Sequence, residues 1–539
     1  MPASILPAVV VRNSARFRRR ILALHYPLTA NGADLYPSGS LMDRRKFLVT
    51  AGASLAASTL NPASGAKAET AASTQSPMPT TKPDRPNIIV IICDDLGYGD
   101  LGCYGSKLAT PNIDRLAAQG VRFTHHCTPI ALCSASRAAL MTGLYPTRVG
   151  ATGAFGPLSD TGMSLDAITT ANVLHNAGYT SIAIGKWHLG DLPQYAPTQR
   201  GFDEFFGVPY SVDMDPLPLL HNSTIVEKEA NRDTLTQQYT KKAVEFLSQP
   251  KEKPFFLYFA HSYPHIPLHA SAAFRGKSDL GLYGDVVEEI DWSVGEILRT
   301  LEANGQRDKT LVFFTSDHGP WFQGSTGNLR GRKGGVYEGG LRIPMIVSMP
   351  GTLPQGRVTE ALASHVDILP TAAGLCHGEL PAYPLDGRDI WPLLTCHQDA
   401  VERQALLSFE GWNIQCARWK QWKLHIARAN TPMFMPTPAQ GRINYTLRNP
   451  ELYNLVDDPK ESYDCAAKFP EVVGTIQKSI QEQLATLPDV VKQAYSATQQ
   501  HLSTPSMPAD SLPEFRNSEA NHGAWLEGAD AEKVLERFK

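Results

Sequence analysis

The segment Asn87-Ile88-Ile89-Val90-Ile91-Ile92-Cys93, followed at once by Asp94-Asp95, decides the fold class. An uninterrupted run of Ile and Val predicts a strand buried on both faces, as in a parallel sheet covered by helices. The two carboxylates then stand at the carboxyl end of that strand, where open α/β sheets bind ligands. They would repel each other unless a cation lay between them, and oxygen ligands suit Ca²⁺ or Mg²⁺. A solvated acidic turn is the alternative interpretation.

Further apolar segments resemble the first, and one of them also ends in an acidic residue. Strands are expected over 180–184, 255–260, 310–315 and 344–349. The third is followed by Asp317-His318, and because parallel strands end at the same edge of a sheet, Asp317 could join Asp94 and Asp95 around one cation. A helix is expected over 283–303, where apolar residues recur at helical spacing. We therefore expect an α/β fold with a large mixed, mostly parallel sheet flanked by helices.

A second segment, Leu132-Cys133-Ser134-Ala135-Ser136-Arg137, places a thiol and a guanidinium at the start of an expected helix that ends at Gly143. Cys133 and Arg137 are four residues apart and therefore lie on the same side of that helix. Backbone N–H groups and a fixed cation at a helix N-terminus suit an oxyanion. The alternative is a cysteine that only packs in the core.

Three more segments combine cations, imidazoles and glycines. Gly185-Lys186-Trp187-His188 follows an expected strand, and alternation along an extended segment would put Lys186 and His188 on the same side. Such a pair could hold an anionic ester and move its proton, whereas a solvated lysine beside a core histidine is the alternative. His265 follows the strand over 255–260, and Lys333 stands in a glycine-rich run that lets the backbone approach an anion.

Length, charge and cysteine usage limit the possible functions. The chain has 539 residues and a net charge of −3 with mixed signs, which argues against nucleic acid as the main partner. The length predicts one large domain and a smaller one. The eight cysteines include no Cys-x-x-Cys pair, so a zinc site of the usual spacing is not expected.

The N-terminal region predicts export. Asp43-Arg44-Arg45-Lys46-Phe47-Leu48, shortly after Met42, resembles a twin-arginine signal. The mildly apolar run over 47–60 is too short for a stable membrane span, and Ala66-Lys67-Ala68 offers a cleavage site. We expect recognition by the twin-arginine translocase and a periplasmic or secreted protein. A basic patch before a linker is the alternative.

The segment around Cys133 resembles the sulfatase signature, Cys-x-Pro/Ala-x-Arg followed by Leu-x-Thr-Gly-x-Tyr-Pro, here Leu140 to Pro146. Ala135 stands where the commonest form has Pro. The resemblance implies an alkaline-phosphatase-like fold and oxidation of the cysteine to formylglycine by a formylglycine-generating maturation enzyme. The hydrated aldehyde of formylglycine would attack the sulfur of a sulfate ester, with a small-molecule or carbohydrate leaving group.

The resemblance also implies a set of site residues. The metal ligands, for Ca²⁺ rather than Mg²⁺, would be Asp94, Asp95, Cys133, Asp317 and His318. The catalytic residues would be Cys133, Arg137, Lys186, His188, His265, Asp317 and Lys333. The substrate-binding residues would be Lys186, Ser211, His265 and Lys333. His318 stands where many members have Asn, and Ser211 belongs to Val208-Pro209-Tyr210-Ser211, which is similar to an arylsulfatase segment.

In the mechanism that the resemblance implies, Arg137 orients the modified side chain and Asp317 helps to deprotonate it. Lys186, His188 and Lys333 neutralise the sulfate oxygens. His265, with Lys333, protonates the leaving oxygen, and His188 then takes a proton so that sulfate is expelled and the aldehyde restored.

The pattern changes to short strands from about Arg403. Together with the resemblance, this change implies an N-terminal extension (1–85), a catalytic domain (86–400), a small α+β domain with an antiparallel sheet (401–490) and a tail (491–539). The small domain is expected to contain strands over 419–426 and 451–455 and a helix over 469–487, and the polar tail to pack loosely. Two other functions stay open. One is hydrolysis of a phosphoester or phosphonate ester by an enzyme of the same superfamily. The other is a non-catalytic, calcium-stabilised binding protein with an unmodified Cys133.

Overall fold

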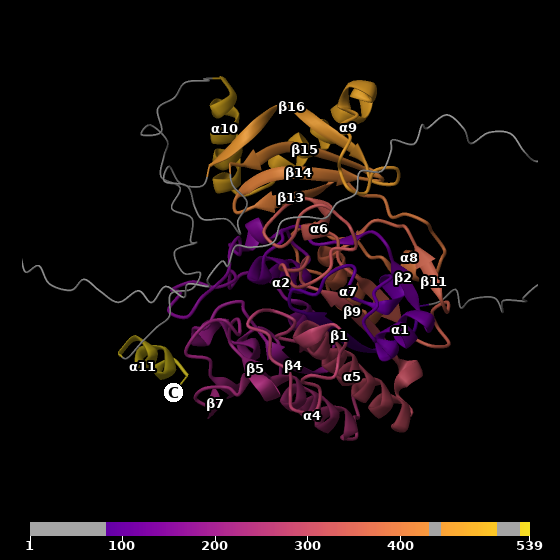
Figure 1. Ribbon diagram of the computed structural model, residues 1–539, viewed down its shortest axis with the longest axis vertical. Coiled ribbons are helices and arrows are strands. Elements are labelled where there is room, and N and C mark those ends of the chain that lie inside the picture. Colours follow the sequence, from indigo (N-terminus) through magenta and orange to yellow (C-terminus); the bar gives the residue numbers. More distant parts are fainter. Residues whose placement is uncertain (1–81, 431–442, 504–528, 539) are drawn as a thin grey trace, which may run out of the picture. The chain divides into compact units, whose positions relative to one another are not determined.

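The computed structural model describes residues 82–430, 443–503 and 529–538, which are coloured in Figure 1. The twin-arginine segment with Arg44 and Arg45 lies outside the described residues, so export stays a prediction. Within the described ranges, no helix is both long enough and apolar enough to cross a membrane.

A ten-stranded sheet forms the centre of the larger domain, in the order β11-β2-β10-β9-β1-β8-β4-β5-β6-β7. The strands are β1 (Asn87–Cys93), β2 (Val121–Phe123), β4 (Thr180–Lys186), β5 (Glu204–Val208), β6 (Leu219–His221), β7 (Thr224–Glu227), β8 (Phe255–Ala260), β9 (Thr310–Ser316), β10 (Met345–Ser348) and β11 (Arg357–Thr359). Strands β9, β1, β8, β4 and β5 run parallel to one another, whereas β10, β6 and β7 are antiparallel to their neighbours. A separate parallel pair joins β3 (His126–Cys127) to β12 (Ala363–Ser364). The predicted mixed, mostly parallel sheet is confirmed.

The alternating residues of β1 supply two hydrophobic cores, one on each face of the sheet. Ile88, Val90 and Ile92 pack with α2, α3 and α7, whereas Ile89 and Ile91 pack with α1, α4 and α5. The helices are α1 (Pro111–Ala118), α2 (Cys133–Thr142), α3 (Thr170–Asn176), α4 (Leu235–Ser248), α5 (Gly281–Ala303), α6 (Glu338–Leu341), α7 (Ile368–Cys376), α8 (Trp391–Leu394), α9 (Pro470–Leu484), α10 (Asp489–Ser503) and α11 (Ala529–Glu536). The unbroken apolar run of β1 therefore reflects burial on both faces.

The smaller domain contains a four-stranded antiparallel sheet with α9 and α10 packed on it (Figure 1). Its strands are β13 (Leu406–Glu410), β14 (Asn413–Trp419), β15 (Trp422–Ala429) and β16 (Asn444–Asn454). The strand expected over 419–426 is confirmed from Trp422 onward, within β15, whereas Trp419 ends β14 and the chain turns between them at Lys420, whose φ is 54°. Neither residue of the turn, Lys420 or Gln421, is the Gly or Asn that usually marks one.

The region after Pro488 also differs from the expected loose tail. Helix α10 buries Val491 and Ala494, and α11 buries Val534. Val491, Ala494 and Tyr495 stand at helical spacing, so the periodicity of this segment indicates a packed helix that its polar composition does not.

Helix α2, which begins at Cys133, packs against both domains. Ala138 and Met141 belong to the core beneath the large sheet, whereas Ala135 and Ala139 belong to the core shared with the small sheet. The helix ends at Gly143, which has a φ of 68° and closes the last turn by donating its N–H to the carbonyl of Ala139. The position of Cys133 thus depends on the packing of both domains.

Candidate active site

The carboxyl ends of β1 and β9 bring three carboxylates together. The two strands are in register up to Cys93 and Ser316, so Asp94-Asp95 and Asp317 leave the sheet at the same level. The N–H of Asp95 donates to Asp317 Oδ1 over 3.1 Å. All three side chains are buried. This is the convergence that the strand pattern predicts.

Cys133 and His318 complete a cluster of possible metal ligands. One donor atom from each of Asp94, Cys133, Asp317 and His318 lies within 4.8 Å of the others, and Asp95, Cys133 and His265 form a second group of this kind. His318 donates from Nδ1 to the carbonyl of Gly319 over 2.9 Å, which directs the lone pair of Nε2 towards Cys133 Sγ, 3.3 Å away. Nitrogen, sulfur and carboxylate donors therefore face one small volume.

Three cations surround the carboxylates. Arg137 places Nη2 3.2 Å from Asp317 Oδ2 and 3.4 Å from Asp94 Oδ1. Lys186 Nζ lies 2.5 Å from Asp94 Oδ2 and donates to Ser211 Oγ over 3.0 Å. Lys333 Nζ donates to Asp95 over 2.8 Å. The structure thus brings Ser211 and all three predicted cations to the carboxylates.

The pKa values of Asp94 and Asp317 are shifted in opposite directions. Burial opposes the ionisation of Asp94, but Lys186, His265 and Arg137 outweigh it and hold its pKa well below the usual range. Burial and the negative charge of Asp94 raise the pKa of Asp317, although His318 and Arg137 act against them. A divalent cation would relieve the repulsion within this pair.

His265 and His188 differ in their charge. Burial and Lys333 oppose protonation of His265, but Asp95 and Asp94 outweigh them and raise its pKa to about 9. Its Nε2 lies 3.8 Å from Asp95 Oδ2. Burial and the positive charge of Lys186 lower the pKa of His188 well below its ordinary value. His188 is therefore a neutral imidazole, and both of its nitrogens are buried without a hydrogen-bond partner.

Lys186 and His188 do not alternate along one extended segment, which corrects the prediction from the sequence pattern. Strand β4 ends at Lys186, and His188 has a φ of 58°, so the extended conformation does not continue through both residues. Trp187 is buried with its indole N–H bonded to the carbonyl of Tyr195. The charges of Lys186 and Asp94 still act on the pKa of His188, so this histidine lies among the site residues. A bent backbone, rather than an extended one, places it there.

Sequence reasoning missed Asp213, which lies beside His265. Its Oδ1 is 4.0 Å from His265 Nδ1 and accepts no hydrogen bond. Burial opposes its ionisation, but His265, a hydrogen bond from Ser211 and Lys186 lower its pKa. The signal that could have found it is its position two residues after Ser211.

Two further histidines flank His265 in the sequence. His261 is fully buried, and burial lowers its pKa to about 3. His269 bonds to Asp233 over 2.7 Å. All eight cysteines are free thiols in the structure.

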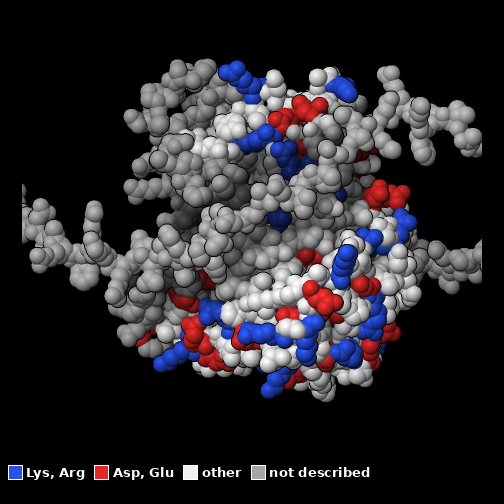
Figure 2. Space-filling view, in the orientation of Figure 1, with Lys and Arg blue, Asp and Glu red and all other residues white. Residues whose placement is uncertain are grey.

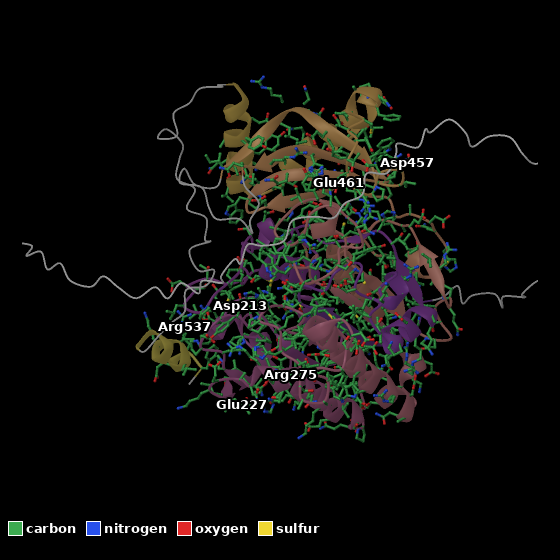
Figure 3. The ribbon with its side chains drawn as sticks, in the orientation of Figure 1. Asp213, Glu227, Arg275, Asp457, Glu461 and Arg537 are labelled. Atoms are coloured by element: carbon green, nitrogen blue, oxygen red, sulfur yellow. The ribbon has the colours of Figure 1, made fainter. Side chains whose placement is uncertain are left out.

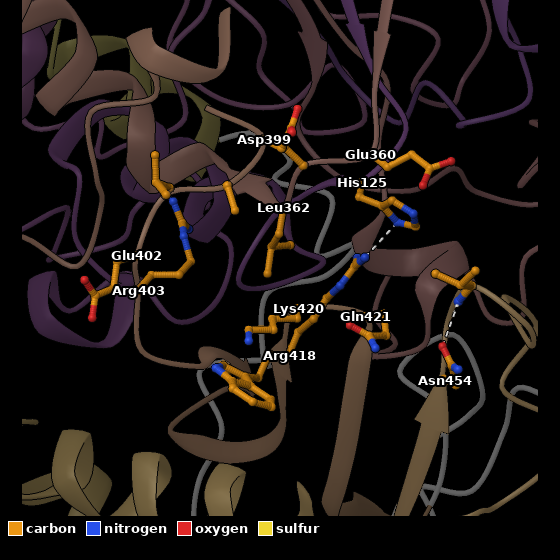
Figure 4. Close-up of a pocket in the computed structure, with 15 residues that line it drawn as sticks. His125, Glu360, Leu362, Asp399, Glu402, Arg403, Arg418, Lys420, Gln421 and Asn454 are labelled. Atoms are coloured by element: carbon orange, nitrogen blue, oxygen red, sulfur yellow. Dashed lines mark hydrogen bonds between the residues drawn. The ribbon is translucent and has the colours of Figure 1, made fainter. Parts of the chain in front are cut away.

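A cavity of about 770 Å³ lies apart from these residues, between the large domain and the β14–β15 hairpin (Figure 4). Arg418 and His125 line it and share a hydrogen bond of 2.7 Å. Acidic and basic side chains are interspersed over the described surface that Figure 2 shows, in keeping with the mixed composition.

Comparisons with known proteins agree with this geometry. The family model of sulfatases matches residues 86–378, and that of the C-terminal region of aryl-sulfatase matches residues 401–517. Arylsulfatase A of Homo sapiens is 36% identical over 440 residues, which cover 73% of this chain and 86% of the relative. N-acetylgalactosamine-6-sulfatase of Sus scrofa is 36% identical over 380 residues, which cover 64% of this chain and 72% of the relative.

The PsFucS1 sulfatase from Pseudoalteromonas sp. is similar in structure, with a TM-score of 0.69, 28% identity and coverage of 76% of this chain and 91% of that one. The family matches extend over both domains and include every residue of the cluster described above. The chain belongs to the sulfatase family, whose members are sulfuric ester hydrolases.

Proposed function

We propose that this protein hydrolyses sulfate monoesters, using formylglycine derived from Cys133 and one bound calcium ion. The observation that carries the proposal is the position of Cys133 Sγ, which lies within the group of Asp94, Asp317 and His318 donor atoms and 3.3 Å from His318 Nε2. A nucleophile at this place would be held beside a cation and faced by three fixed positive side chains.

The donor atoms fit a calcium ion. Asp94 Oδ1 is buried and accepts no hydrogen bond, although Arg137 Nη2 lies 3.4 Å away, so this oxygen has capacity for a metal ion. Carboxylate oxygens are the ligands that calcium prefers, and Asp94 and Asp317 supply them in one group with His318 as a softer donor. Asp95 adds an oxygen beside this group, 3.5 Å from His318 Nε2. When bound, the ion would supply Lewis-acid polarisation of a sulfate oxygen.

Modification of Cys133 would have to precede complete folding. The residue is only 3% exposed, so a maturation enzyme could not reach it in the folded chain. Formylglycine, when formed, would supply a hydrated aldehyde as the nucleophile at the position that Sγ occupies. Arg137 lies four residues further along α2 and anchors that end of the helix to Asp94 and Asp317.

The remaining residues bind the ester and move protons. Lys186 and Lys333 approach the cluster from two directions and would neutralise sulfate oxygens as charge develops on them. His265 would donate a proton to the leaving oxygen. His188, neutral and without a partner, is able to accept a proton and would do so when sulfate is released.

A carbohydrate sulfate ester is the substrate class we favour, with aryl sulfates as convenient probes. The N-acetylgalactosamine-6-sulfatase similarity and a Ps i-CgsB structure in complex with k-i-k-neocarrahexaose, 28% identical with a TM-score of 0.64, support a sugar leaving group.

The test is to co-express the chain with a formylglycine-generating enzyme and to measure the peptide that contains Cys133 by mass spectrometry. Conversion should lower its mass by about 18 units. The converted protein should hydrolyse 4-nitrophenyl sulfate faster than 4-nitrophenyl phosphate, and Cys133→Ala should abolish this activity. A faster phosphate reaction would instead favour a phosphoester hydrolase. An intact thiol together with calcium binding would favour a binding protein.

A further inference from the structure

The loop that carries Lys333 is held in part by hydrogen bonds of the large domain, such as the one from the N–H of Lys333 to the carbonyl of Pro320 over 3.2 Å. Gly331 and Gly334 flank the lysine closely and have φ values of 81° and 79°, which non-glycine residues rarely adopt. The loop leads into α6, which has four residues and begins at Glu338. Glycines of this kind permit many backbone conformations, so contacts with other parts of the protein contribute to the position of Lys333.

The carboxylate of Glu338 binds cations that come from the smaller domain. Lys423 of β15 donates to Glu338 Oε1 over 3.0 Å, and Arg418 of β14 donates to Oε2 over 3.2 Å. Arg342, at the end of α6, adds a third contact of 2.5 Å. Glu338 is only 1% exposed. The end of the loop is thus held by buried charges of the small sheet.

Glu461, also in the smaller domain and labelled in Figure 3, holds the loop at both ends. Its Oε1 accepts the backbone N–H of Glu338 over 2.6 Å, and its backbone carbonyl accepts the guanidinium of Arg330 over 2.8 Å. Lys423 neutralises its carboxylate at 3.2 Å, and His425 orients it through a hydrogen bond of 2.6 Å. We call Glu338, Lys423, Glu461 and His425, together with Arg418, the interdomain charge cluster.

The same loop is bonded directly to the site. The N–H of Gly334 donates to the carbonyl of Ala131, two residues before Cys133, over 2.9 Å. The carbonyl of Gly340 accepts the N–H of Gly319, next to His318, over 2.8 Å. A displacement of Glu338 would therefore be transmitted along the loop to Lys333 and to its neighbours in the site.

Stability alone is a weak reason for burying so many charges. Removing charges from water is costly, and well-packed apolar residues often serve the fold equally well. Ionic contacts, by contrast, fix directions as well as distances, because each hydrogen bond requires a particular orientation. This property suits a cluster whose function is to place one loop.

We propose that the smaller domain positions Lys333 for sulfate binding, with Lys423 and Glu461 as positioning residues that act through Glu338. The inference rests on the proposed sulfate-ester hydrolysis and extends it, since it assigns a role in that reaction to residues of a second domain that make no contact with the carboxylates of the site.

The test is a double-mutant cycle with the full-length, formylglycine-containing protein. Lys423→Met should lower kcat/KM for 4-nitrophenyl sulfate about tenfold or more, mainly through KM, because a small displacement of a binding cation is costly. In a Lys333→Met background the same substitution should change kcat/KM less than about twofold, because the residue through which it acts is already lost. Lys420→Met, an exposed lysine in the same hairpin, is the matched control and should have no effect.

Other outcomes would overturn the proposal. Equal losses in the two backgrounds would show that Lys423 only stabilises the fold, and no loss in either would show that it does not act on Lys333. If Lys423→Met does not fold, Glu461→Gln, which retains the shape of the side chain, takes its place in the cycle with the same criteria.

A second measurement separates this proposal from the proposed function. Inorganic sulfate should raise the Tm of the wild type and raise that of Lys423→Met less. If the converted wild type hydrolyses no sulfate ester, the proposed function fails, and the difference in the sulfate-induced Tm shift still decides whether the cluster positions Lys333. Equal shifts in both proteins would contradict it.

Discussion

Lys333 Nζ lies 2.8 Å from Oδ1 and 3.0 Å from Oδ2 of Asp95, so one ammonium group spans both oxygens of a possible metal ligand. Burial opposes the charge on Lys333, but Asp95 outweighs it and raises the lysine pKa well above its ordinary value. The lysine therefore stays charged at neutral pH. It can orient Asp95 and still direct its remaining N–H groups to an incoming anion.

Replacing Lys333 by Met should lower kcat/KM for 4-nitrophenyl sulfate by about 10²–10³-fold, the usual cost of losing one group that stabilises developing negative charge. Steady-state kinetics on the converted protein measures this. Lys309→Met is the control. Lys309 is exposed and precedes the amino end of β9, whereas the site lies at the carboxyl end of that strand. A loss below threefold would contradict the role of Lys333.

Calcium should stabilise the protein against heat, because it relieves the repulsion between Asp94 and Asp317. At a concentration 100-fold above its Kd, a ligand that binds only the folded state adds about 2.7 kcal/mol to the free energy of unfolding. The Tm should therefore fall on treatment with EGTA and recover with Ca²⁺ more than with Mg²⁺.

The matched variants for the calcium experiment are Asp94→Asn and Asp399→Asn. The first removes a proposed ligand, and the calcium-dependent rise in Tm should disappear. The second changes a carboxylate whose side chain is 95% exposed, and the rise should persist. A rise that survives in Asp94→Asn would place the ion elsewhere.

Ser211→Ala should have a smaller effect than the loss of a cation. The hydroxyl accepts one hydrogen bond from Lys186, whose other partner, Asp94, remains. One such bond contributes about 1 kcal/mol, so KM should rise about fivefold with kcat nearly unchanged. Ser181 stands near the start of β4, the strand that ends at Lys186, and Ser181→Ala should leave KM unchanged. A similar rise of KM in both variants would argue against a site role for Ser211.

The strand pattern was sufficient to predict where the carboxylates meet. Asp94, Asp95 and Asp317 each follow an apolar strand, and register along β1 and β9 then forces them together. Such a prediction succeeds because the direction of parallel strands is fixed by the fold, so residues more than 200 positions apart have only one edge at which to meet.

The interdomain charge cluster could not be predicted in the same way. Lys423 and Glu461 lie in a segment of short strands with ordinary charged residues, which in isolation are typical of a solvated surface. They are buried only because the small sheet packs on the loop at Glu338, more than 80 positions earlier. The backbone of His188 could not be predicted from the sequence either. It is left-handed, a conformation that usually indicates itself by a glycine, and this position is a histidine.

The ionisation of Glu338 makes the stability of the protein depend on pH. Burial opposes its charge, but Lys423, Arg342 and Arg418 outweigh it and hold its pKa well below the ordinary value. A carboxylate with a depressed folded-state pKa contributes stability above its unfolded pKa, about 4.3, and loses it as the pH falls towards the folded-state value. Each unit below pH 4.3 should remove about 1.4 kcal/mol of this contribution until the folded-state pKa is reached.

Glu338→Gln isolates this contribution from those of other carboxylates. At pH 7 the substitution should lower the free energy of unfolding by about 3–5 kcal/mol, because it leaves three buried cations short of a partner. Urea unfolding followed by tryptophan fluorescence at pH 7, 4.5 and 3.5 measures the difference from wild type. It should be constant between the first two values and smaller at the third, since only the wild type has a carboxylate to protonate at position 338. A difference that stays constant down to pH 3.5 would mean that Glu338 is not held ionised by the cluster.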